Sequence, residues 1–156
     1  MNFKELIEKV ESSEEFKEWH KSNKDYFLAH FFRILEEDNW QIGYSNGEEV
    51  ASITLNPLVI EEHQEINKKP GSKVLPLNIE NYKIDFNKAK EIFFNLLKEK
   101  YIGENLFKTI VIVQNIDGVN LYNITGLTHS FKTLNVKIDT EGKILDDSLI
   151  ALVSQS

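Results

Sequence analysis

Residues 40–55 read WQIGYSNGEEVASITL, and this stretch decides the fold class. Large apolar residues alternate with small or polar ones over 40–45, which predicts a strand with one buried face. Asn46-Gly47 comes next and is typical of a tight hairpin, because both central residues of a type I′ turn need positive φ. Val50 to Leu55 then supplies a return strand that ends before Pro57. The stretch therefore predicts an antiparallel β-hairpin.

Two short helices and a strand are predicted ahead of this hairpin. Apolar residues in 3–10 recur at i, i+3, i+4 and i+7, which marks one face of a first helix. Ser12 and Glu15 stand at capping-box spacing, so a second helix is expected to start near Ser13. Residues 26–35 are rich in aromatic and apolar side chains on both faces, as expected of a central strand.

A similar order of patterns returns in the second half of the chain. Residues 61–84 are polar or irregular and predict a connector. Asp85 is a suitable N-cap for a helix whose apolar stripe runs to Tyr101. Asp117-Gly118 predicts a second hairpin turn. The strands expected around it cover residues 107–113, 119–125 and 131–139, followed by apolar segments within 144–153.

Segment 13–55 can be laid over segment 86–139, because each gives a helix followed by three strands. The sequence therefore predicts an α+β fold in which helices pack on antiparallel β-meanders, as a tandem duplication of a helix-plus-three-strand unit. The expected organisation is 1–60 for the first helices and meander, 61–84 for an irregular connector and 85–156 for the second unit. All three parts are expected in one compact globule.

The composition restricts the classes of function. The 156 residues include 18 Lys and Arg against 25 Asp and Glu, a net charge of −7, which argues against a nucleic-acid binder. The absence of cysteine excludes disulfide scaffolds, thiol nucleophiles and cysteine-ligated metals. Charges interrupt every apolar stretch near the N-terminus, so no signal peptide or membrane span is expected. We therefore expect a cytoplasmic protein that binds no membrane.

One part of the second half resembles a known family. Residues 134–145 read LNVKIDTEGKIL, a strand, an acidic turn with glycine and a short strand. This is similar to the end of PepSY domains, and residues 40–42 offer an aromatic residue where that family opens a central strand. A helix followed by an antiparallel meander is also the layout of cystatin-like modules. The resemblance implies a non-catalytic module that binds or restrains a protein partner.

No motif specific to catalysis or to a cofactor is present. The chain has no GxGxxG, P-loop, GxSxG, HExxH or EF-hand pattern, so we assign no catalytic, cofactor or metal residues. Glu61, Glu62, His63 and Glu65 form a local acidic group that could hold a divalent cation, but a solvated loop explains it as well. Asp146-Asp147 is expected in a solvated turn or at a helix N-terminus.

Five residues are candidates for a ligand pocket. His30 shares a predicted strand face with Leu28, Phe32 and Ile34, and a neutral imidazole among aromatics could act as a base or anchor a ligand. Arg33 lies on the opposite face and could hold an anion or form a structural ion pair. Aromatic residues could line the pocket or simply fill the core; they are Phe31, Trp40 and Tyr44.

The sequence leaves three functions open. We expect a non-enzymatic protein-binding or regulatory module without cofactor, because catalytic motifs are absent and an antiparallel sheet offers a face or edge to a partner. The alternative is a small-molecule binder or enzyme of cystatin-like cone shape that uses the five pocket residues. A third reading is self-association through an edge strand or through the apolar stripe of residues 3–10.

Overall fold

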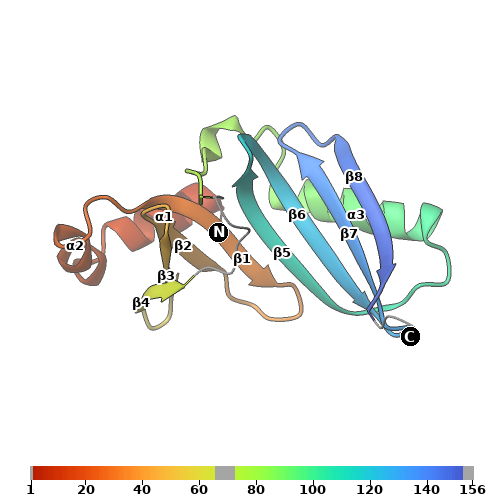
Figure 1. Ribbon diagram of the computed structural model, residues 1–156, viewed down its shortest axis with the longest axis horizontal. Helices are drawn as coiled ribbons and strands as arrows, with labels where there is room; N and C mark the ends of the chain where they lie inside the picture. Colours follow the sequence, from red (N-terminus) through yellow and green to blue (C-terminus); the bar gives the residue numbers. More distant parts are fainter. Residues whose placement is uncertain (1, 66–72, 153–156) are drawn as a thin grey trace.

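The computed structural model describes residues 2–65 and 73–152, with side chains up to residue 62 in the first range. The fold is α+β, with three α-helices and an open, antiparallel sheet of eight strands (Figure 1). The first half gives α1 (Phe3–Glu11), α2 (Glu14–Lys21), β1 (Phe27–Ile34), β2 (Gln41–Ser45), β3 (Glu49–Thr54) and β4 (Val59–Glu65). The second half gives the short 3₁₀ helix η1 (Ile79–Asn81), α3 (Phe86–Lys100), β5 (Leu106–Ile116), β6 (Val119–Thr128), β7 (Lys132–Asp139) and β8 (Ile144–Ala151).

Each half forms its own meander, and the two meanders join through their first strands. The strand order is β4-β3-β2-β1-β5-β6-β7-β8, so β1 and β5 lie side by side at the centre. They pair antiparallel, with Phe32 opposite Ile112 and Ile34 opposite Ile110. The predicted central position of the first long strand is therefore confirmed. Each half has four strands rather than three, since β4 and β8 add an edge strand to each meander.

The three α-helices within the described residues pack on one face of the sheet. Phe3 of α1 lies 4.4 Å from Phe31 of β1, and Phe16 of α2 lies 5.0 Å from Tyr44 of β2, both measured between ring centroids. Figure 1 shows α3 crossing behind β6, β7 and β8. Gly126 of β6 leaves room for the Leu106 side chain and for Phe93 of this helix, because an added Cβ would lie 2.8 Å from Leu106 and 3.3 Å from the Phe93 ring. The apolar core fills this side of the sheet.

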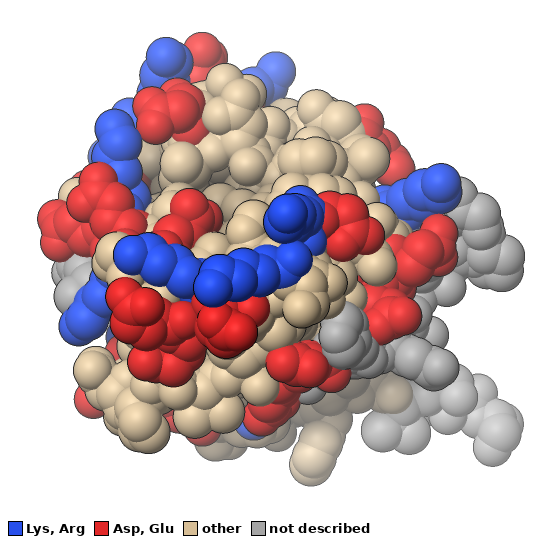
Figure 2. All heavy atoms as spheres, turned by 90° about the vertical axis from the view of Figure 1, so that its left-hand side faces the viewer, with Lys and Arg blue, Asp and Glu red and all other residues tan. Residues whose placement is uncertain are grey.

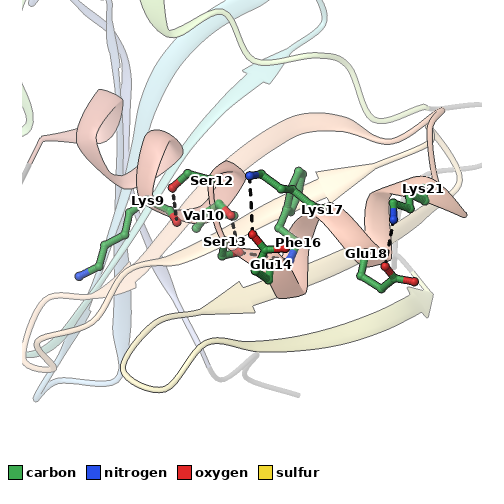
Figure 3. A network of polar contacts seen from close by, with 9 residues as sticks. All are labelled: Lys9, Val10, Ser12, Ser13, Glu14, Phe16, Lys17, Glu18 and Lys21. Atoms are coloured by element: carbon green, nitrogen blue, oxygen red, sulfur yellow. Dashed lines mark hydrogen bonds and ion pairs between the residues drawn. The ribbon is translucent and has the colours of Figure 1, made fainter.

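The junction between α1 and α2 is held by serine caps that differ from the predicted ones (Figure 3). The capping box of Ser12 and Glu15 is wrong, because Ser12 ends α1 and its hydroxyl donates to the carbonyl of Lys9. Ser13 is the N-cap of α2, and its Oγ accepts the N–H of Phe16 at 3.1 Å. The same hydroxyl donates to Val10 O, so one side chain serves both helices.

The two predicted hairpins form, although their turns differ. Asp117 and Gly118 have φ values of 52° and 92°, as a type I′ turn requires. In the first hairpin only Gly47 has a positive φ, so the predicted type I′ turn is wrong there. Its loop is longer, and Asn46 Oδ1 accepts the N–H groups of Glu48 and Glu49. A side-chain cap therefore replaces the backbone conformation expected of Asn46.

Two segments expected to be irregular are edge strands. β4 begins at Val59 and takes up the start of the predicted 61–84 connector. Asp146 and Asp147 lie within β8 and not in a turn or at a helix start. Short polar edge strands have too little apolar alternation to stand out from loops, which explains both errors. The division into units 1–60 and 85–156 stays a prediction. No helix in the described parts of the chain is long and apolar enough to span a membrane.

Candidate functional site

Arg33 and Trp40 are the two predicted pocket residues that lie together at a hollow. The hollow has a volume of about 520 Å³ and lies between the two halves of the chain. The first half contributes the start of α1, Arg33 and Trp40, and the second contributes residues 79–87 and Tyr122. We call this space the seam hollow, because it lies beside the pairing of β1 with β5.

Arg33 and Trp40 hold each other in place at the seam hollow. The guanidinium carbon of Arg33 lies 5.6 Å from the centroid of the Trp40 ring, a cation–π distance. Its Nε donates to the carbonyl of Glu37 at 3.1 Å. No carboxylate of the described residues forms an ion pair with Arg33. The structural ion pair considered from the sequence is therefore absent among these residues.

His30 lies on the other face of the sheet, away from the seam hollow. A β-bulge shifts the register of β1, so that Leu28 stands opposite Tyr44 whereas His30 stands opposite Gly43. Leu28 and His30 consequently point to opposite faces, and the shared face predicted for them is wrong. The imidazole rests on Gly43, where an added Cβ would lie 2.1 Å from His30 Cε1. Burial lowers the pKa of His30 to about 4.

Phe31 and Tyr44 belong to the core. Phe31 is fully buried beneath Phe3, and its ring centroid lies 6.3 Å from that of Trp40. Tyr44 donates from its hydroxyl to Glu11 Oε2 at 2.7 Å, and burial together with this bond raises the pKa of the tyrosine. Tyr44 lines a separate hollow of about 420 Å³ under α2. The five predicted residues therefore do not meet at one pocket, and their role toward a ligand stays a prediction.

Within the described residues, no group of three or more His, Asp or Glu side chains is placed to hold a metal ion. Glu61 and Glu62 are exposed on β4, and the side chains of His63 and Glu65 lie outside the described residues. Figure 2 views the molecule from the α2 end and shows lysines beside acidic residues. Among the described residues of α2, Lys17 pairs with Glu14 and Lys21 pairs with Glu18. This end of the molecule presents charge of both signs.

The face of the sheet opposite the α-helices carries a group of apolar side chains. Cross-strand pairing places Phe32 beside Ile112 and Ile34 beside Ile110, and alternation turns all four away from the core. Further along the sheet, Leu127 of β6 stands opposite Thr133 of β7, and Thr133 stands opposite Ile150 of the edge strand β8, so both apolar side chains lie on this face. We call this set the apolar patch, and it consists of Phe32, Ile34, Ile110, Ile112, Leu127 and Ile150. Five of its members are partly buried, and Ile150 is 60% exposed.

A row of amide and hydroxyl groups borders the apolar patch on β6 and β7. The Asn135 amide donates to Asn123 Oδ1 at 2.7 Å and to Thr125 Oγ1 at 2.9 Å. Lys137 Nζ donates in turn to Asn135 Oδ1 at 2.8 Å. These bonds fix the orientation of the side chains, so the polar border of the patch is ordered in the free protein.

Two exposed aromatic residues lie at the end of the sheet where β6 turns into β7. Phe131 is 67% exposed and has a φ of 61°, which is uncommon for a bulky residue. Its N–H donates to Thr128 O, and its carbonyl accepts the N–H of Leu152. Phe107 is 50% exposed at a bulge in β5 and contacts His129. Sequence reasoning missed both, because each phenylalanine lies within a strand-like run that looks like ordinary core.

Comparison with known proteins gives a fold and no family. The chain is similar to the crystal structure of a "putative lipoprotein" from Clostridium difficile 630, with a TM-score of 0.52 and 14% identity. The match covers 86% of this chain and 90% of the other. No protein-family model matches the sequence, and no curated protein matches it. At this identity the likeness extends to the fold alone.

Proposed function

We propose that the protein is a non-enzymatic binding module that engages another protein through the apolar patch. The observation that carries this proposal is the contact between Phe32, Ile34 and the isoleucines of β5 on a face that no α-helix of the described residues covers. Contiguous apolar side chains on a soluble domain favour an interaction site. The ordered amides of β6 and β7 provide the polar border that such interfaces have.

Phe131 and Phe107 extend the proposed interface beyond the end of the sheet. Aromatic residues provide much of the binding energy at protein interfaces, since a rigid ring buries a large area. The left-handed φ of Phe131 is supported by hydrogen bonds on both sides, from its N–H to Thr128 and from Leu152 to its carbonyl. These bonds fix the backbone position from which the exposed ring projects.

The face is a better docking surface than the edge of the sheet. β8 is an edge strand, and it carries Asp146 and Asp147 near its middle. Charged residues on an edge strand oppose the addition of a further strand. A partner is therefore expected to lie across the apolar patch rather than to extend the sheet at β8.

The sequence resemblance supports the same kind of function. A PepSY-like module would be non-catalytic and would restrain or bind a protein, and the repeated helix-plus-meander layout is compatible with an internal duplication of such a unit. The net charge of −7 disfavours nucleic acid as the partner. We propose that the protein acts in the cytoplasm and not at a membrane, with a second copy of the chain as the alternative partner.

The experiment introduces a photo-crosslinking residue, p-benzoylphenylalanine, in place of Ile150 in cells that produce the protein. Ile150 is exposed at the margin of the patch, and Ile102, which is 82% exposed in the turn after α3, is the matched control position. We expect a discrete crosslinked product from position 150 and none from position 102. Mass spectrometry of the product identifies either a different protein or a second copy.

A substitution separates specific binding from random capture. Ile150→Asp places a charge on the patch and should abolish the interaction with the protein identified by crosslinking. Ile102→Asp makes the same chemical change elsewhere and should leave it intact. Equal binding of both variants, or crosslinking of equal strength at both positions, would contradict the proposed interface.

A further inference from the structure

The seam hollow has the size of a small-molecule site and is built from both halves of the chain. Its volume of about 520 Å³ lies within the usual range for ligand pockets. Phe3 and Arg33 reach it from α1 and β1, while Phe86 and Tyr82 reach it from the second half. It lies on the helix side of the sheet, away from the apolar patch, so it is independent of the proposed protein interface.

Arg33 provides the hollow with a cation that the described residues do not neutralise. The guanidinium has five N–H donors, and its one hydrogen bond within the described residues uses Nε. The contact with the Trp40 ring holds the group near the hollow without using its N–H donors. An arginine held in this way can donate two parallel hydrogen bonds to the two oxygens of a carboxylate.

The other charges around the hollow also favour an anion. Lys4 and Lys83 line it with Arg33, against the single acid Asp85, in a protein whose net charge is −7. The Asp85 carboxylate already caps α3 by accepting the N–H of Lys88 at 2.9 Å. Lys4 lies 3.6 Å from Glu80 at an exposed position, where solvent weakens the pair. The local charge therefore has the opposite sign to that of the whole molecule.

Main-chain donors add to this character. Phe86 and Asn87 form the first turn of α3 and line the hollow, and their N–H groups have no acceptor within the helix. Phe3 and Lys4 likewise form the first turn of α1 and line the hollow. These N–H groups add to the attraction that Arg33 exerts on an anion, but they do not make a binding site by themselves.

Aromatic rings form the apolar wall. The Trp40 ring stands edge-on to Phe3 and to Phe86, with ring centroids 5.1 Å apart in both pairs. Trp40 is thus shared between the two halves, and its surroundings suit a flat apolar group. We propose that the seam hollow binds a small organic carboxylate whose charged group meets Arg33 and whose flat apolar body lies against Trp40.

The test titrates the purified protein with benzoate and follows heat by calorimetry, together with the intrinsic tryptophan fluorescence to which Trp19 and Trp40 contribute. Benzamide, which has the same shape and no charge, is the matched control ligand. We expect saturable binding of benzoate and binding of benzamide that is about tenfold weaker or absent. Failure of benzoate to bind up to its solubility limit, or equal binding of the two, would overturn the proposal.

Variants assign the binding to the hollow. Arg33→Gln keeps hydrogen-bonding capacity and removes the charge, so it should weaken benzoate binding about tenfold. Lys98→Gln makes the same charge change at an exposed position in the last turn of α3 and should not alter binding. If Arg33→Gln fails to fold, Lys83→Gln at the exposed rim takes its place with a smaller loss expected. Equal loss in Lys98→Gln would place the anion elsewhere and reject the site.

Discussion

His30 and Gly43 show at the scale of single residues how one missing side chain positions another. The imidazole occupies the space in which any other residue at position 43 would place its Cβ. The ring lies against the glycine on the face of the sheet opposite to Arg33, and it is largely shielded from water. The depressed pKa of His30 follows from this burial, since the protein loses the solvation of the charged form.

Substitution of Gly43→Ala should destabilise the protein by about 1–3 kcal/mol, because the new methyl group displaces the His30 ring. Urea unfolding at pH 7 measures the loss. His30→Ala removes the obstacle, so the double variant should lose less stability than the sum of the two single variants, with a coupling energy of about 1 kcal/mol or more. Strict additivity would show that the ring and the glycine do not meet.

The pKa of His30 also predicts a pH dependence of stability. The folded value of about 4 lies below the unfolded value near 6.5, so the unfolded chain binds more protons between them. Stability should therefore fall as the pH falls through this window, by about 2 kcal/mol between pH 7 and pH 5. Unfolding curves of the native protein and of His30→Gln check this, since the variant should lack that part of the decline. Parallel declines in both proteins would argue against a buried histidine.

At the scale of elements, the C-terminal end of α3 is tied to the edge strand β8. Asp147 accepts hydrogen bonds from Lys100 Nζ, at 2.7 Å, and from the hydroxyl of Tyr101. These two bonds lower the pKa of the Asp147 carboxyl, with the lysine contributing most. The sequence predicts this acid in a solvated turn or at a helix N-terminus, but it joins the last strand to the helix behind it.

Replacing Asp147→Asn should cost about 1–2 kcal/mol of unfolding free energy at pH 7, because a charge-assisted hydrogen bond is lost. Asp146→Asn is the control, since Asp146 is more exposed and lies 3.9 Å from Lys137, so its change should stay within about 0.5 kcal/mol. Because the folded pKa of Asp147 is lowered, the difference between native protein and Asp147→Asn should shrink as the pH falls through that pKa. A larger loss of stability in Asp146→Asn would contradict the connection of β8 to α3 through Asp147.

Elements with strong local patterns could be predicted from the sequence, and those without them could not. The apolar stripe of α3, its Asp85 cap and the turn at Asp117-Gly118 are each encoded by residues that lie close together in the chain. The bulge beside His30 has no such signal, because it depends on how β1 meets β2. For that reason the residue types of the candidate pocket could be named, while the faces on which they lie could not all be assigned.

At the scale of the whole molecule, the pairing of β1 with β5 makes one sheet from two meanders. Five residue pairs connect these strands, and Trp40 of the first half packs edge-on to Phe86 of the second. The sequence predicted two similarly built halves but not the way they join. Contacts between strands so distant in the chain leave no local pattern in the sequence. The seam hollow, which depends on this junction, could not be predicted either.

The continuous sheet predicts cooperative unfolding. Both tryptophans, Trp19 and Trp40, lie in the first half, so their fluorescence reports on that half, whereas far-UV circular dichroism reports on all strands. In urea the two signals should change at the same midpoint, because loss of β1 exposes the edge of β5. A fluorescence midpoint clearly below that of circular dichroism would mean that the halves unfold as separate domains.

The strained turn at Phe131 has a consequence for how the protein could be improved. Glycine or asparagine adopts a left-handed backbone more readily than phenylalanine, so Phe131→Gly should relieve about 1 kcal/mol of conformational cost. The natural chain thus carries an avoidable energetic burden at an exposed position. An engineer who selected for thermal endurance alone would remove this ring first, and with it the aromatic anchor that we assign to partner recognition.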